Sequence, residues 1–167
     1  MSELPHQEFL FTTAEVAAAF VGFSLISSIL RPAGEIQRFL QLRGVAEVSL
    51  IVVAGSLLPY VAFQFDVQGE WLWRASSGAL ALTQLVGGGL AYRRSHMIES
   101  LLRSAPRLTA FGTLGNLCGI GLLLWTVFVG GALSAPRYLV ALSILLTLAG
   151  LMFVWATFLK ASDSSAV

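Results

Sequence analysis

Long apolar runs separated by short polar links dominate the pattern of this chain. Five runs are near 20 residues or longer, over residues 9–30, 42–64, 71–92, 108–131 and 137–160. A helix of about 20 apolar residues crosses the roughly 30 Å of hydrocarbon in a bilayer. The runs lack the short alternating segments of a membrane barrel. The pattern predicts an all-α integral membrane protein, a polytopic bundle of five transmembrane helices that forms one domain over residues 1–167.

The link between the third and fourth runs is the longest. In this link, Ile98, Leu101 and Leu102 share one helical face. An apolar stripe beside charged residues is typical of a helix that lies on the membrane surface. We therefore expect an interfacial helix at about 97–105, with a solvated linker as the alternative.

Basic residues gather on one side of the predicted bundle. Alternation places seven arginines and one lysine on the side that carries the C-terminus: Arg31, Arg38, Arg43, Arg93, Arg94, Arg103, Arg107 and Lys160. Only Arg74 and Arg137 fall on the other side. Cytoplasmic loops are enriched in arginine and lysine, so we predict the N-terminus outside and the C-terminus inside. Aromatic residues at the predicted outer ends fit an interfacial belt: Trp71, Trp73, Trp125 and Tyr138.

Composition agrees with a lipid environment. Hydrophobic residues make up 56% of the chain and charged residues 11%, against roughly 25% charged in soluble domains. The mean hydropathy is +0.80. A net charge of +1 argues against a nucleic-acid partner. The N-terminus carries Glu3 and Glu8 without a lysine or arginine, so we expect the first run to be a retained span rather than a cleaved leader.

Glu15 is a carboxylate inside the first apolar run. Thr12, Glu15, Ala19 and Gly22 form one helical stripe, with Ala18 beside it. Small residues allow helices to approach closely, so we expect this stripe to face other helices. Arg74 lies about three residues into the third run, at a similar predicted depth, and is the predicted ion-pair partner of Glu15. The alternatives are that Arg74 reaches the headgroups, and that Glu15 is protonated or meets a water-filled vestibule.

Four further polar residues fall inside predicted spans. Arg43 and Glu47 are spaced i, i+4 and can pair on one helix. Gln84 and Asn116 fall at matching depths, Gln84 on a stripe with Ser77, Ala81 and Gly88. We predict a hydrogen bond between the two amides. One interpretation is polar contacts that hold a tight bundle, and the other is a hydrated path through Glu47, Gln84 and Asn116 towards Glu15.

Small residues predict close helix packing in several spans. The residues expected at such contacts are Ala18, Gly22, Gly88, Gly112, Gly115 and Gly119. Pro59 is expected to kink its span and free a backbone carbonyl, because proline has no N–H to donate.

Candidate chemistry is sparse. The sequence contains no zinc-protease, phosphate-loop or nucleophile-elbow motif, and its one cysteine, Cys118, lies in an apolar run. We therefore expect no catalytic residues, no metal and no cofactor. The carboxylates Glu15 and Glu47 fall near opposite leaflets, which disfavours an enzyme.

Two functions remain. The first is a self-associating channel or transport-like protein with a polar path through the membrane, which works as a homo-oligomer. The second is a non-catalytic accessory subunit that stabilises or anchors a larger membrane complex. The stretches AEVAAAFVGF and LRGVAEVSL resemble those of small bacterial inner-membrane proteins, a resemblance that implies a location but no activity.

Overall fold

The fold is a bundle of long helices that run alongside one another. The computed structural model describes residues 4–29, 36–93 and 106–159. These residues form α1 (Gln7–Ile29), α2 (Ile36–Gln64), α3 (Glu70–Arg93), α5 (Pro106–Val129) and α6 (Ser134–Val154), followed by a π-helical turn, η1 (Trp155–Leu159). No strand occurs within these ranges. The prediction of an all-helical chain is thereby confirmed for the described residues.

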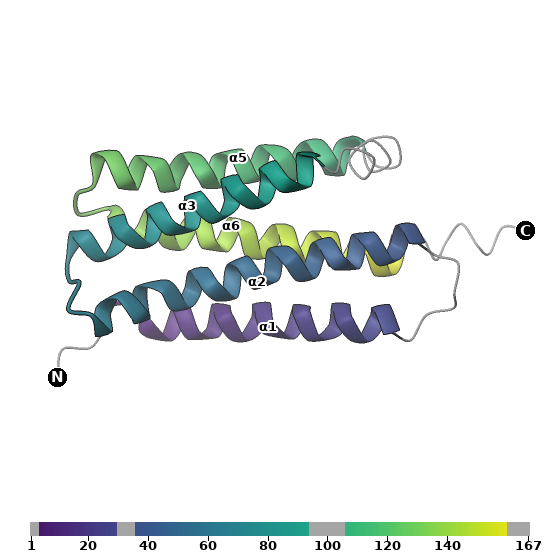
Figure 1. Cartoon of the computed structure of the whole chain (residues 1–167), viewed down its shortest axis with the longest axis horizontal. Coiled ribbons are helices and arrows are strands. Elements are labelled where there is room, and N and C mark those ends of the chain that lie inside the picture. Colours follow the sequence, from purple (N-terminus) through teal and green to yellow (C-terminus); the bar gives the residue numbers. More distant parts are fainter. Residues whose placement is uncertain (1–3, 30–35, 94–105, 160–167) are drawn as a thin grey trace, which may run out of the picture.

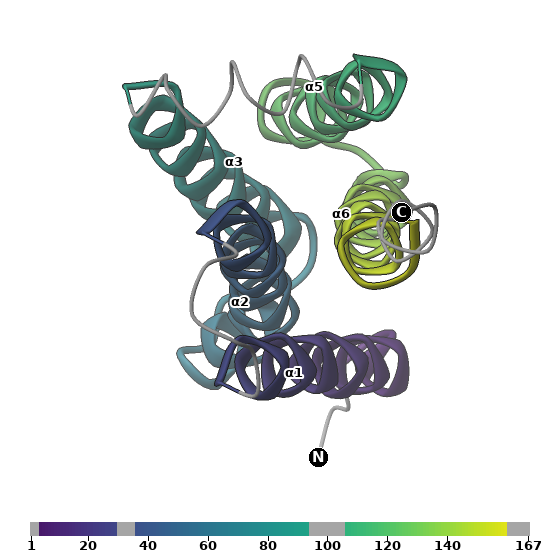
Figure 2. The same ribbon diagram turned by 90° about the vertical axis from the view of Figure 1, so that its right-hand side faces the viewer.

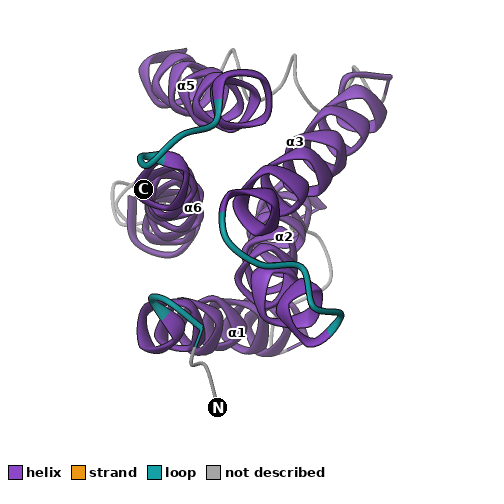
Figure 3. Ribbon diagram, turned by 90° about the vertical axis from the view of Figure 1, so that its left-hand side faces the viewer, coloured by secondary structure: helices purple, strands orange, loops and turns teal. Residues whose placement is uncertain are grey.

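Successive helices alternate in direction. The start of α1, the α2–α3 link and the α5–α6 link lie at one end of the bundle (Figure 1). We call this the loop end and define it by residues 4–6, 65–69 and 130–133; Figure 3 views it directly. α1 and α5 lie at opposite edges, with α2 and α6 between them (Figure 2). α1 packs on α2 and α6, whereas α3 packs mainly on α5 and α2.

Among the described residues, four helices are long and apolar enough to cross a membrane, which indicates a multi-pass membrane protein. They cover Gln7–Ile29, Leu42–Gln64, Ala110–Val129 and Ser134–Thr157. α3 forms where the third span was predicted but is not one of the four, because serines, glycines and Gln84 interrupt its apolar sequence. The transmembrane placement of α3 and the sidedness of the bundle therefore stay predictions. The interfacial helix expected at about 97–105 lies outside the described residues.

The centre of the bundle is a close contact of α2, α3 and α6. A β-carbon built on Gly55 would lie 3.1 Å from side-chain carbons of both Leu80 and Leu142. This distance is shorter than an ordinary van der Waals contact, so a side chain at residue 55 would require the leucines to shift by a few tenths of an ångström. The buried core extends from this point and includes Val52, Leu80, Leu123, Leu142 and Leu145.

The carbonyl freed by Pro59 has a partner inside the protein. Pro59 lies within α2 and has no N–H for the carbonyl of Gly55, four residues earlier. The hydroxyl of Tyr138 on α6 donates a hydrogen bond to this carbonyl. Because an unsatisfied carbonyl in an apolar interior is costly, this bond stabilises the protein and joins α2 to α6. The kink expected at Pro59 stays a prediction.

Two of the predicted belt aromatics are buried instead. Tyr138 has no exposed surface and Trp73 is 5% exposed, with their ring centroids 5.7 Å apart. The prediction of a membrane-facing Trp73 and Tyr138 is therefore wrong, since both rings fill the interior below the loop end. Trp71 and Trp125 are exposed, as a belt requires.

Candidate functional site

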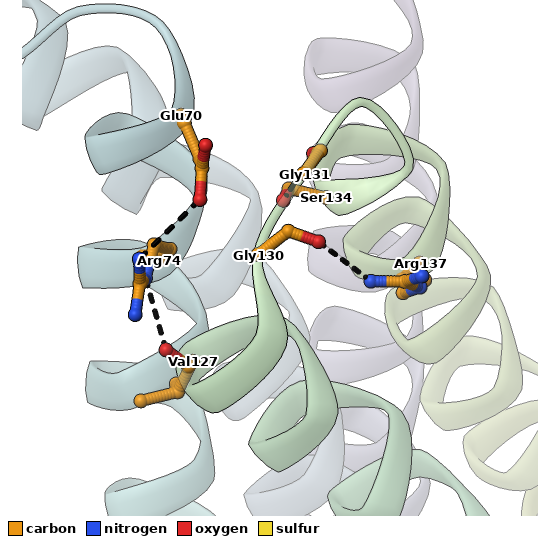
Figure 4. A network of polar contacts seen from close by, with 7 residues as sticks. All are labelled: Glu70, Arg74, Val127, Gly130, Gly131, Ser134 and Arg137. Atoms are coloured by element: carbon orange, nitrogen blue, oxygen red, sulfur yellow. Dashed lines mark hydrogen bonds and ion pairs between the residues drawn. The ribbon is translucent and has the colours of Figure 1, made fainter.

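Two arginines organise the loop end by binding one carbonyl in the last turn of α5 and one directly after this helix. Arg74 donates from Nε to the Val127 carbonyl at 2.9 Å and from Nη1 to Glu70 Oε1 at 3.3 Å (Figure 4). Arg137 donates to the Gly130 carbonyl at 2.9 Å. The last carbonyls of a helix have no partner within it, and cations near that end are favourable. The arginines therefore stabilise the end of α5 and the α5–α6 link.

Both arginines also lie over tryptophan rings. The Arg74 guanidinium carbon is 5.0 Å from the Trp71 ring centroid, and that of Arg137 is 5.6 Å from the Trp125 centroid. Such distances allow a cation–π attraction. Charged heads beside exposed tryptophans are typical of the level of lipid headgroups.

Glu15 does not pair with Arg74. Arg74 is bound to Glu70 and Val127, and α1 packs on α2 and α6 rather than beside α3. The predicted ion pair is therefore wrong. Glu15 is exposed, and it has no hydrogen bond or ion pair with any part of the chain that the structure describes.

The small-residue stripe of α1 faces away from the bundle. Thr12, Glu15, Ala18 and Ala19 are exposed, and nothing lies within 4 Å of a β-carbon built on Gly22. Packing of this stripe on the chain's own helices was predicted, and the structure contradicts it. The reason is that α1 turns the opposite face to the core, burying Leu10, Thr13, Ala17 and Ser24. We call the stripe Thr12, Glu15, Ala18, Ala19 and Gly22 the Glu15 face.

The predicted contact between Arg43 and Glu47 is confirmed. Arg43 Nε and Glu47 Oε1 are 2.9 Å apart on α2. Their side chains are 50% and 54% exposed, so the pair lies on the outside of the bundle. A path from Glu47 through the interior to Glu15 is therefore not assembled within one chain.

Gln84 is buried without a hydrogen-bond partner. Its side chain is 4% exposed, and neither polar atom of its amide is bonded to a residue that the structure describes. The predicted bond to Asn116 is therefore wrong. At this level α5 turns towards α6 instead, since a β-carbon on Gly115 would lie 3.2 Å from Leu148 and one on Gly119 4.0 Å from the Ala141 carbonyl.

The predicted packing glycines divide into two groups. Gly115 and Gly119 lie at close helix contacts, as just described. At Gly112 and Gly22, no atom lies within 4 Å of a built β-carbon, so neither glycine is at a close contact. Gly88 lies in α3, but its surroundings are outside what the structure describes.

Hydroxyl groups in the helices also form two groups. Most bind the carbonyl four residues earlier on their own helix: Ser28, Ser56, Thr83, Thr126, Ser143, Thr147 and Thr157. Four buried serines have no partner: Ser24, Ser49, Ser76 and Ser77. Ser76 and Ser77 lie on α3 with Gln84, so α3 carries more unpartnered buried polar groups than any other described helix. We call Ser76, Ser77 and Gln84 the α3 polar face.

A pocket of about 270 Å³ opens at the loop end above this face. Its walls come from the two links and the first turns of α3 and α6: Gly69, Glu70, Trp73, Gly131, Ala132, Ser134 and Ala135. Trp73 is its innermost residue on α3, and Ser77 follows one helical turn deeper on the same side of the helix. Along α3, Trp73 therefore lies between the other α3 residue of the pocket, Glu70, and the α3 polar face.

Sequence reasoning missed the role of Glu70 and the buried role of Tyr138. Glu70 and Arg74 are spaced i, i+4, a signal that could have revealed their pairing. Gly55 and Pro59 have the same spacing, but the donor that binds the freed carbonyl lies in another helix.

The described residues contain no group of three histidine, cysteine, aspartate or glutamate side chains that could hold a metal ion, and Cys118 is an exposed free thiol. The chain matches no protein family, and no curated protein or solved structure is similar to it. The class that the fold defines is a multi-pass helical membrane protein.

Proposed function

We propose that this protein is a transport-like membrane protein that passes a small solute along the inner side of α3 and assembles with copies of itself. The α3 polar face is the observation that carries this proposal. It presents two serines and an amide to the interior, all without partners. An unpartnered polar group in an apolar interior costs roughly 1–3 kcal/mol, so polar molecules that enter the bundle are favoured there.

The composition of α3 supports a central place for this helix. Among the described long helices, α3 is the one that is not apolar enough to count as a membrane span, whereas the helices around it are. A polar helix is tolerated in a membrane when it is covered by protein or lines a cavity. We propose that α3 crosses the membrane as the third of five spans, with the N-terminus outside and the C-terminus in the cytoplasm of a bacterial cell.

The Glu15 face supports self-association. A charged residue inside a membrane is costly, by at least about 2.5–3.5 kcal/mol at the centre, and Glu15 has no partner among the described residues of its own chain. A second copy brings another Glu15 to the same depth, and a protonated carboxyl both donates and accepts hydrogen bonds. The small residues around Glu15 would let two α1 helices approach closely.

Disulfide crosslinking tests the self-association. Ala19→Cys is made in a Cys118→Ser background and oxidised in native membranes. Leu82→Cys is the matched control, since Leu82 is also exposed at mid-helix but lies on α3. We expect covalent dimers with Ala19→Cys and none with Leu82→Cys. Equal yields from the two variants, or none from either, would contradict an interface at the Glu15 face.

An accessory subunit remains the second candidate, and the same face favours it. A helix of a different membrane protein could equally cover Ala18, Ala19 and Glu15. Extraction from the native membrane in mild detergent separates the two functions. A single stoichiometric partner together with absent dimers would favour the accessory subunit, whereas a homo-oligomer without a partner would favour the transport-like protein.

A further inference from the structure

We infer that the solute of the α3 polar face is small, polar and uncharged, an inference that rests on the proposed transport function. The buried polar side chains of the described residues are all neutral: Thr13, Ser24, Ser49, Ser56, Ser76, Ser77, Gln84, Thr126 and Ser134. Hydroxyls and one amide provide hydrogen bonds but no net charge. The interior thus matches a solute that needs hydrogen bonds and no counter-charge.

The charged side chains that the structure describes within the helices lie elsewhere. Glu15 is exposed on α1, and Arg43 and Glu47 pair on the outer side of α2. Arg74 is held at the loop end by Glu70 and the Val127 carbonyl. An ion that leaves water for the centre of the described bundle would therefore meet no opposite charge there.

Desolvation separates the two kinds of solute. Moving an ion into a medium of low dielectric constant is far more costly than moving a neutral polar molecule. Ion channels offset this cost with rings of carbonyls or charged side chains. Three neutral side chains on one helix can replace the few hydrogen bonds of a water-sized molecule or a small alcohol or amide, but not the hydration shell of an ion.

The arrangement of these side chains leads inward from the pocket. Trp73, Ser77 and Gln84 lie at i, i+4 and i+11, which places them along one side of α3 over about 16 Å. The pocket reaches Trp73 from the loop end. On the proposed route the solute passes from the pocket to Ser77 and then to Gln84, which requires the buried Trp73 ring to move away from Tyr138.

Flux into proteoliposomes tests the inference. Purified protein is reconstituted, and uptake of water, urea and glycerol is followed by stopped-flow light scattering. Potassium and chloride fluxes are measured in the same vesicles with a voltage-sensitive dye. Gln84→Leu removes the amide at similar volume, and Thr83→Val is the control, because Thr83 is the exposed neighbour whose hydroxyl binds the Ala79 carbonyl.

We expect faster uptake of at least one neutral solute than in protein-free vesicles, no ion flux, and about tenfold slower uptake with Gln84→Leu. Thr83→Val should behave as the wild type. Ion flux that Gln84→Leu abolishes would overturn the inference while the transport function stands. Neutral uptake that Gln84→Leu leaves unchanged, or that Thr83→Val slows equally, would overturn the assignment of the α3 polar face. Vesicles impermeable to every solute would overturn the transport function itself.

Discussion

The bond between Tyr138 and the Gly55 carbonyl should be a main determinant of stability. Tyr138→Phe keeps the buried ring and removes only the hydroxyl that donates to this carbonyl. Because Pro59 provides no N–H, the carbonyl is then left without a donor in the core. A buried acceptor that loses its partner costs about 1–3 kcal/mol. In a chain of this size each kcal/mol corresponds to roughly 2–4 °C in Tm.

A double-mutant cycle isolates this bond. In Pro59→Ala, residue 59 regains an N–H that can bind Gly55 within α2, so the Tyr138 hydroxyl is no longer required. Tyr138→Phe should therefore cost at least about 1 kcal/mol less in the Pro59→Ala background. Thermal unfolding in detergent, followed by circular dichroism, measures all four proteins. Equal costs of Tyr138→Phe in the two backgrounds would refute the role assigned to the freed carbonyl.

Two other regions give stability predictions. Gly130→Ala should lower Tm more than Gly131→Ala: both glycines have positive φ, but only a β-carbon at Gly130 meets the Glu70 carboxylate that Arg74 binds. The left-handed conformation costs each alanine about 1–2 kcal/mol. Adding Glu70→Ala should remove the additional loss of stability that Gly130→Ala shows relative to Gly131→Ala. If that additional loss persists, a clash with Glu70 is not its cause. Gln84→Leu should raise stability by about 1–3 kcal/mol, because it replaces a buried unpartnered amide, and a lower Tm would show that the amide is bonded.

The helices themselves follow from the lengths of the apolar runs. The predicted runs 9–30, 71–92 and 108–131 correspond within two residues at each end to α1, α3 and α5. In a membrane every backbone group must be bonded within the chain, so a long apolar run can form little else than a helix. Contacts within one helix could also be predicted from the sequence. Arg43 and Glu47 pair because helical spacing alone brings them together.

Contacts between helices could not be predicted from the sequence in this way. α1 is apolar on nearly all sides, so its sequence does not show which face turns to α2 and α6. The prediction that small residues mark the inner face failed for this reason, and with it the pairing of Glu15 and Arg74. Arg74 instead donates hydrogen bonds to the Glu70 carboxylate on its own helix and to the Val127 carbonyl near the end of α5. A partner four residues away is always within reach, whereas a partner on another helix depends on the whole arrangement.

Some of the polar side chains without a described partner point out of the bundle and others point into it, and the two groups can bind different kinds of partner. Glu15 points out of the bundle, so only another protein or the lipid surface can meet it. Gln84 and Ser77 point inward with almost no exposed surface, so only a molecule that enters the bundle can bind them. Crosslinking at Ala19 and flux through Gln84 therefore measure independent properties. A chain that forms dimers without flux would be an assembly protein with a polar interior, and one that conducts as a monomer would need another explanation for Glu15.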